Sequence, residues 1–184
     1  MIVRGRAIVA ALTLCASLAQ AQAQGVPEPE GLRGPPYRAA VPATLSGATV
    51  VDDDAAYKLW QEGEVAFIDV LPRAPKPENL PKNTIWREKP RQSIPGAIWL
   101  PNTGYEQIAE ETTRYLRRGL EQATAGDPAH PVLIFCLMDC WMSWNVAKRA
   151  IEMGYETVYW YPDGTDGWDM EDHPLERLDP LPQD

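Results

Sequence analysis

The sequence is poor in the residues that build metal centres. Its 184 residues include only two histidines and three cysteines, and their spacing does not form the four-ligand pattern of a structural zinc site. Asp163, Asp166 and Asp169 lack the alternating ligands and terminal glutamate of an EF-hand loop, so a turn is the preferred interpretation there. We therefore predict no metal site, and nothing in the sequence indicates a tightly bound cofactor.

The sequence also lacks excess positive charge and any apolar run long enough to cross a membrane. Its net charge is −9, which makes nucleic acid and anionic membrane surfaces poor candidates as partners. The longest apolar run, residues 7–18, is too short for a membrane span. Arg4 and Arg6 precede it and small residues follow it. This pattern is typical of a secretory signal peptide over residues 1–23, cut after Ala21 or Ala23.

Export to a bacterial periplasm follows from that interpretation. Cleavage would remove Arg4, Arg6 and Cys15, so the net charge of the remaining chain becomes −11. Only Cys136 and Cys140 would then remain, in a compartment that oxidises thiols. Two cysteines this close in sequence cannot hold a small domain together, so we interpret them as a local pair.

The sequence around these cysteines predicts a buried strand, a short loop and a helix. Residues 132–135 form a short apolar run that predicts a strand buried on both faces, and Cys136 follows directly. Helical spacing of apolar residues predicts a helix over residues 143–153, with Gly154 as its C-cap. Backbone N–H groups at a helix start favour an anion, so a thiol there has a lowered pKa and becomes a nucleophile.

The remaining pattern predicts an α/β fold with a mainly parallel central sheet flanked by helices. Short apolar segments predict strands over residues 48–51, 65–70, 98–100 and 156–161, and helical periodicity predicts helices over residues 55–62 and 105–124. A glycine-containing loop is expected over residues 162–168. Ligands bind such folds at the carboxyl ends of the strands, where Asp69 and Cys136 are expected.

Proline-rich segments lie outside this core. Residues 24–44 are expected to form an extended N-terminal arm, with Tyr37 and Val41 pinning its end, and residues 171–184 a loose tail. The domain itself is expected over residues 45–170. Within it, residues 71–93 carry many prolines and the densest basic charge, so they form either an irregular surface excursion or a lid over a partner or substrate.

Several motifs together resemble the rhodanese family, which has a three-layer α/β fold. They are Asp69-Val70 after a strand, Ile94-Pro95-Gly96-Ala97, the strand–Cys136–helix unit, and Gly154-Tyr155-Glu156 before the last strand. The resemblance implies that Cys136 accepts a sulfur atom as a persulfide, held by backbone N–H groups of its loop. It places Asp69 at the position of the family's aspartate near that loop, and we include Asp69 in the catalytic set.

The cysteine loop departs from the rhodanese pattern Cys-x-x-Gly-x-Arg-Ser. The arginine position falls on Trp141, or on Met142 if the loop is one residue longer, and neither is cationic. Asp139 adds a negative charge that is expected to raise the pKa of the thiol and repel anionic donors. Thiosulfate is therefore a poor donor candidate. The expected substrate or partner contacts are Asp139, Trp141, Met142, Ser143, Arg73 and Trp168.

A narrower resemblance is to exported "CXXCW motif" proteins associated with PQQ-dependent catabolism. The segments that carry it are residues 136–145 and residues 159–168, together with the arm around residues 37–48. The resemblance implies a role in support of quinoprotein alcohol oxidation. The expected partner is a periplasmic quinoprotein dehydrogenase or its accessory proteins, and any association with PQQ would run through that partner.

Three hypotheses for the cysteine pair remain open. Cys136 could accept sulfur while Cys140 resolves the persulfide as a disulfide. The pair could instead be a redox-active or structural disulfide, in a thiol–disulfide partner or a non-catalytic binding module. A metal or cofactor site is the third, for which His130 and His173 are the weak support. Trp144 and Trp160 are expected in the core, while Trp141 is expected to wall the site.

Overall fold

A five-stranded parallel sheet forms the centre of the protein. In the computed structural model, which describes residues 25–87 and 89–183, the strand order is β1-β6-β5-β2-β4 and every pairing is parallel. The strands are β1 Thr49–Val50, β2 Ala66–Asp69, β4 Ile98–Trp99, β5 Val132–Phe135 and β6 Val158–Tyr161. This confirms the predicted α/β fold, and it puts the strand before Cys136 in the middle of the sheet.

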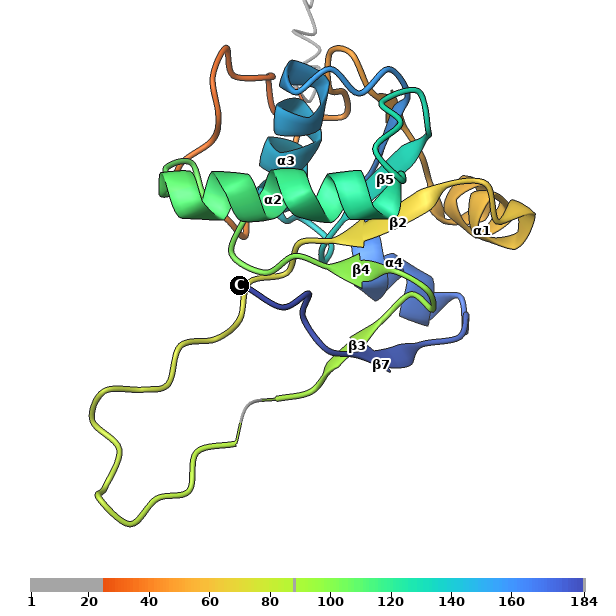
Figure 1. The fold of residues 1–184 in the computed structure, drawn as a ribbon. Helices are drawn as coiled ribbons and strands as arrows, with labels where there is room; N and C mark the ends of the chain where they lie inside the picture. The colour runs from red at the N-terminus through yellow and green to blue at the C-terminus, as the bar shows by residue number, and fades with distance from the viewer. Residues whose placement is uncertain (1–24, 88, 184) are drawn as a thin grey trace, which may run out of the picture.

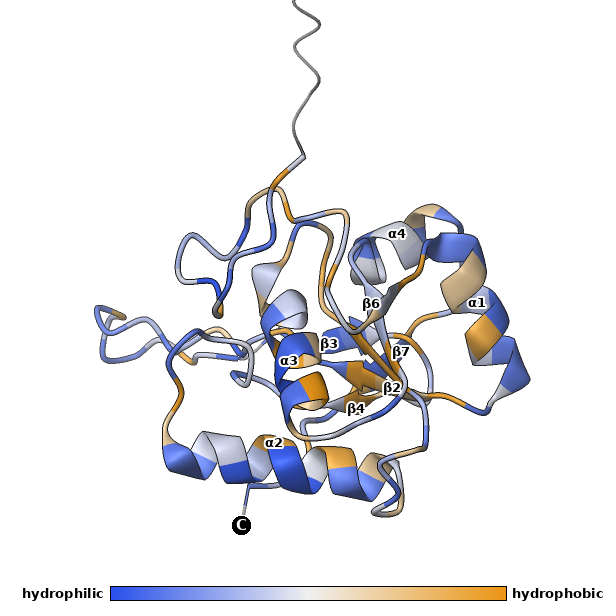
Figure 2. Cartoon of the chain, turned by 90° about the horizontal axis from the view of Figure 1, so that it is seen from above, coloured by the Kyte–Doolittle hydropathy of each residue, from blue (hydrophilic) through white to orange (hydrophobic). Residues whose placement is uncertain are grey.

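Helices cover both faces of this sheet (Figure 1). They are α1 Asp53–Glu62, α2 Glu110–Ala123, α3 Trp141–Glu152 and α4 Gly164–Met170. The side chains of β2 and β5 alternate between two apolar clusters. Ile68 and Ile134 pack with α2 and α3, whereas Phe67 and Leu133 pack with α1 and α4. Figure 2 shows hydrophobic colour on β2 and β4, between the helices. The result is a three-layer architecture, with Trp144 and Trp160 fully buried as predicted.

Two helix boundaries show how local chemistry sets the elements. The Asp52 side chain accepts a hydrogen bond from the Ala55 N–H at 3.0 Å, and Gly63 in the left-handed region ends α1. Helix α2 begins at Glu110 rather than at the predicted Tyr105. The carbonyls of Tyr105 and Glu106 instead accept hydrogen bonds from the buried Arg149 guanidinium, at 2.7 and 2.9 Å.

The C-terminal region differs from the sequence prediction in two places. The expected loop over residues 162–168 is largely helix α4, and the expected loose tail contains strand β7 Glu176–Leu178. This strand pairs antiparallel with β3 Arg91–Ser93. The Leu181 N–H then donates to the Trp99 carbonyl at 3.0 Å. These pairings are remote in sequence, so the local composition of the tail does not reveal them.

The N-terminal arm also packs more closely than predicted. It runs beside the start of α3 in Figure 1. The Asn145 side chain accepts from the Arg33 N–H at 2.8 Å and donates to the Arg33 carbonyl at 2.9 Å. Further along, the Trp141 N–H donates to the Tyr37 carbonyl at 2.9 Å. The arm is therefore part of the folded structure around the second cysteine.

The predicted signal peptide, residues 1–23, lies outside the described residues. Within residues 25–87 and 89–183, no helix is both long and apolar enough to cross a membrane.

Gly164, the first residue of α4, is where the helix meets the cysteine loop. Its φ is +53°, and a Cβ at this position would lie 2.5 Å from the Cys136 carbonyl oxygen. The next residue, Thr165, donates its N–H to that same oxygen at 3.1 Å. Both the conformation and the close approach therefore require glycine here.

Replacing this glycine tests how tightly α4 holds the loop. We expect Gly164→Ala to lower the free energy of unfolding by about 3 kcal/mol or more, because strain and a backbone clash act together. Gly126→Ala is the matched control, since Gly126 also has positive φ (+78°) but no atom within 4 Å of an added Cβ. The control should cost about 1–2 kcal/mol. Equal losses in urea unfolding would contradict the close contact.

Candidate functional site

The two cysteines form a disulfide at the carboxyl end of the central strand. Cys136 follows β5 directly, and Cys140 immediately precedes α3. Their Cα atoms are 6.2 Å apart, and the residues are 0% and 2% exposed. The disulfide, one of the hypotheses that the sequence left open for this pair, is therefore present in the structure. Both sulfur atoms belong to the apolar cluster under α2 and α3.

The loop between the cysteines is tightly folded. Asp139 is exposed and has a φ of +52°, the left-handed region that aspartate tolerates better than most residues. The Met138 N–H donates to an Asp166 carboxylate oxygen at 3.1 Å, and the Asp139 carbonyl accepts from the Ala39 N–H at 3.1 Å. Two neighbouring segments, α4 and the arm, thus both hold this loop by hydrogen bonds.

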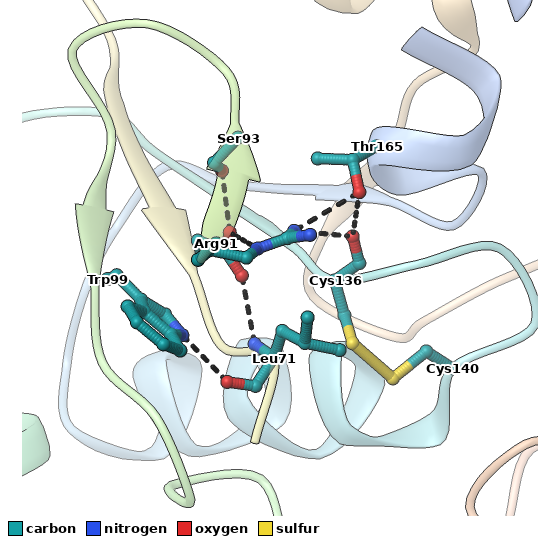
Figure 3. A network of polar contacts seen from close by, with 8 residues as sticks. Leu71, Arg91, Ser93, Trp99, Cys136, Cys140 and Thr165 are labelled. Atoms are coloured by element: carbon teal, nitrogen blue, oxygen red, sulfur yellow. Dashed lines mark hydrogen bonds and ion pairs between the residues drawn. A yellow bond between two sulfur atoms is a disulfide. The ribbon is translucent and has the colours of Figure 1, made fainter. Parts of the chain in front are cut away.

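A buried ion pair lies next to the loop (Figure 3). The Arg91 Nε donates to Asp69 Oδ2 at 2.6 Å, and the Ser93 hydroxyl donates to the same oxygen at 2.5 Å. The Leu71 N–H donates to Asp69 Oδ1 at 2.9 Å. Complete burial raises the pKa of the Asp69 carboxyl, and the Arg91 guanidinium and the other donors oppose that rise. The Asp69 carboxylate is therefore fully engaged by Arg91, Ser93 and Leu71. In the described part of the chain, it makes no hydrogen bond to either sulfur atom.

Arg91 connects this ion pair to the cysteine loop. Its terminal nitrogen donates to the Thr165 hydroxyl at 3.1 Å and to the Cys136 carbonyl at 3.4 Å, and the Thr165 hydroxyl donates to the same carbonyl at 3.3 Å. Sequence reasoning missed Arg91, because it is one of several basic residues in a proline-rich stretch. The available signal was its position two residues before Ser93, which puts both on one face of a strand.

A cleft of about 430 Å³ opens beside the loop, at the carboxyl edge of the sheet. Its lining includes Arg73, a contact residue predicted from the sequence, along with Leu71, Lys89, Arg91, Leu137, Thr165, Asp166 and Asp169. Leu71 and Leu137 also pack against the cluster that contains both cysteines. The cleft therefore ends one layer of apolar side chains away from the disulfide.

The base of the long loop frames this cleft. Residues 72–87 extend away from the sheet in Figure 1, and the chain returns to the fold at strand β3, which lies beside β7. The Arg73 N–H donates to the Asn102 side chain at 3.1 Å, which holds the near end in place. The structure is compatible with both predicted roles for this loop, as a surface excursion and as a lid.

The other residues named from sequence are mostly buried. The Trp141 indole donates to the Ala40 carbonyl at 3.1 Å, so the arm covers the predicted wall residue. The Ser143 hydroxyl donates to the Cys140 carbonyl and accepts from the Trp160 indole, while Met142 packs against Gly104. Trp168 lies in the cluster on the opposite face, with α1 and α4. The structure thus gathers Trp141, Met142 and Ser143 at the second cysteine and places Trp168 elsewhere.

No group of His, Cys, Asp and Glu in the described ranges has the arrangement of a metal site.

Comparison with known proteins identifies the fold family. The profile described as "Rhodanese: Rhodanese-like domain" matches residues 52–171. No curated protein matches the chain. Among solved structures, similarity is found to a thiosulfate sulfurtransferase from Pseudomonas aeruginosa, at 17% identity and a TM-score of 0.47, covering 72% of this chain and 21% of that one. The chain thus spans about a fifth of that protein.

A second similar structure is the polysulfide-sulfur transferase homodimer from Wolinella succinogenes. It has 21% identity and a TM-score of 0.46, and the match covers 71% of this chain and 80% of that one.

The buried ion pair gives a pH-dependent prediction. Arg91→Met leaves the Asp69 carboxylate buried without its cation, so we expect a loss of about 3–5 kcal/mol in unfolding free energy at about pH 7. In this variant burial raises the folded-state pKa of Asp69 above its unfolded value, so the folded protein binds the proton more readily. The variant's stability therefore falls as pH rises, and its loss should be smaller at about pH 5.

Urea unfolding of wild type and variant at both pH values measures this difference. The double variant Asp69→Asn with Arg91→Met is the control, because it has no buried carboxylate and should lose the pH dependence. An Arg91→Met loss that is the same at both pH values would contradict the ion-pair account.

Proposed function

The chain belongs to the rhodanese-like domain family, and from that membership we propose that it performs cysteine-based sulfur-transfer and thiol redox chemistry. The observation that carries this proposal is the Cys136–Cys140 disulfide at the end of the central strand β5 and at the start of α3. A thiolate generated there by reduction would be stabilised by the helix dipole. The pair thus supplies a nucleophile and a resolving thiol.

The proposed cycle begins with the reduced pair. The Cys136 thiolate attacks the outer sulfur of a donor persulfide, R–S–SH, and R–S⁻ leaves, so that Cys136 now carries the sulfur as a persulfide. The Cys140 thiolate then attacks the inner sulfur of this persulfide, which forms the disulfide and releases HS⁻. Two thiols are oxidised while one sulfane sulfur is reduced to sulfide. An external thiol must then reduce the disulfide.

The surrounding residues support this chemistry indirectly. Asp69 holds Arg91, and Arg91 donates to the Cys136 carbonyl, so we assign both residues roles in positioning the loop. The positions where a typical rhodanese carries an arginine hold Trp141 or Met142 here, and Asp139 adds a negative charge. These differences favour a donor other than thiosulfate.

The burial of the cysteines favours a second candidate function. At 0% and 2% exposed, the two cysteines are covered by neighbouring side chains. Leu71 and Leu137 separate the disulfide from the cleft, and the arm covers the side near Trp141. A disulfide that serves only to fix the loop would make the protein a binding module, with the cleft as its binding surface.

We further infer a cellular setting from the sequence resemblance. The N-terminal pattern supports export to the periplasm, and the CXXCW-type segment supports a role beside PQQ-dependent alcohol oxidation. The proposed partner is a quinoprotein dehydrogenase or one of its accessory proteins, with PQQ bound by that partner. Co-purification of tagged protein from periplasm tests this setting, and its absence from the periplasmic fraction would overturn it.

Removing the resolving thiol tests the catalytic proposal. We expect Cys140→Ser, after incubation with cysteine persulfide, to retain one additional sulfur atom on Cys136, because nothing resolves the persulfide. Reduced wild type should instead release sulfide and return to the disulfide. Intact mass, with and without reductant, detects both products, and peptide mapping locates the sulfur.

Cys136→Ser is the matched control, which should neither hold the sulfur nor release sulfide. A Cys140→Ser protein whose Cys136 stays an unmodified thiol would favour the binding-module function. It would contradict the sulfur-transfer proposal.

A further inference from the structure

The cleft beside the disulfide carries charges of both signs. Its volume of about 430 Å³ lies within the range of small-molecule sites. Asp166 and Asp169 line the wall made by α4, while Arg73 and Lys89 line the wall made by the long loop. Leu137 of the cysteine loop also lines the cleft. The loop lies next to the acidic wall, because the Met138 N–H donates a hydrogen bond to Asp166. A ligand that reaches the cysteines therefore passes close to a carboxylate.

The Asp166 carboxylate accepts a hydrogen bond from a backbone N–H group that could otherwise bind an anion. Backbone N–H groups in the turn before a helix are a natural anion-binding site. Here the Met138 N–H donates to Asp166 at 3.1 Å, and the Trp141 N–H donates to the Tyr37 carbonyl at 2.9 Å. The protein's own oxygen atoms thus satisfy two of the loop's donors, one of them with a full negative charge.

Two of the cations near the loop are already paired with carboxylates. Arg91 is paired with the buried Asp69. Arg38 lies 3.6 Å from Asp166, but both side chains are more than 40% exposed, so solvent screens this pair.

Further carboxylates lie beside the loop. Burial raises the pKa of Asp163, and the nearby charges of Asp53, Asp139 and Asp52 raise it further.

We propose that Asp166 determines specificity, so that the cleft accepts small thiols and persulfides with a positive group beside the sulfur. This aminothiol class would be favoured over anionic donors such as thiosulfate. The proposal rests on the function proposed above and names its substrate class. A carboxylate at the loop attracts the ammonium group of an approaching aminothiolate and repels a donor whose other end is anionic.

The reaction that reports this selectivity is reduction of the disulfide. A thiolate R–S⁻ attacks one sulfur of the Cys136–Cys140 pair, which forms a mixed disulfide and releases the other cysteine as a thiolate. A second R–S⁻ attacks the mixed disulfide at the R-group sulfur, so R–S–S–R leaves and the second cysteine thiolate is released. Two external thiolates are oxidised and the protein disulfide is reduced.

The experiment compares cysteamine with 3-mercaptopropionate as reductants of wild type, Asp166→Asn and Asp169→Asn. Asp169→Asn is the matched control, because it removes the same charge from the same wall of the cleft. In the described part of the chain, the Asp169 carboxylate makes no hydrogen bond to the loop. Samples are quenched by alkylation, and intact mass gives the fraction reduced with time. The rate of reduction by cysteamine is divided by the rate with 3-mercaptopropionate. This ratio is then divided by the same ratio measured with hydroxyethyl disulfide, which corrects for the intrinsic reactivity of the two thiols.

In wild type we expect a normalised preference for cysteamine of about tenfold at low salt, decreasing as salt is added. Asp166→Asn should lower this preference by about fivefold, whereas Asp169→Asn should lower it by less than about twofold. Asp166→Glu keeps the charge and should keep most of the preference, which separates the effect of charge from a change in folding.

Two results would overturn the inference while leaving the proposed function intact. One is a normalised ratio near one in wild type. The other is an equal loss of preference in Asp166→Asn and Asp169→Asn. If neither thiol reduces the pair in wild type, the redox function itself fails, and the specificity proposal fails with it.

Discussion

The buried ion pair between Asp69 and Arg91 is the interaction on which the site depends. It joins three parts of the chain, because Asp69 ends β2, Arg91 begins β3, and the Arg91 guanidinium reaches the Cys136 carbonyl after β5. An uncompensated charge at this depth would be strongly destabilising, so the two residues must be kept together. The ion pair therefore positions the cysteine loop through the Cys136 carbonyl. In the described part of the chain, it makes no hydrogen bond to either sulfur atom.

The second constraint acts through the N-terminal arm. The indoles of Trp141 and Trp144 donate to arm carbonyls, and the Asn145 amide binds the backbone of Arg33 on both its N–H and its carbonyl. These residues immediately follow Cys140. The segment that differs most from a typical rhodanese loop thus binds this chain's own arm, which explains why its aromatic residues are buried.

The sequence was sufficient for the parts of this fold that depend on local pattern. An apolar run ending at Cys136 and helical periodicity after it identified β5 and α3, because such patterns survive in any tertiary context. Helix α4 was missed since Gly164 and Gly167 favour a turn, and the close approach of Gly164 to Cys136 is a tertiary contact. Strand β7 and Arg91 were missed for the same reason, because their partners lie far away in the chain.

The central claim is that Cys136 and Cys140 form a functional redox pair rather than a fixed bridge. The most direct test is the reduction potential of this pair, measured by intact mass after equilibration of the protein in a series of dithiol redox buffers. A pair that cycles with thiols should have a potential above about −300 mV, within reach of thiol reductants. A potential well below about −300 mV would mark a structural disulfide and contradict the claim.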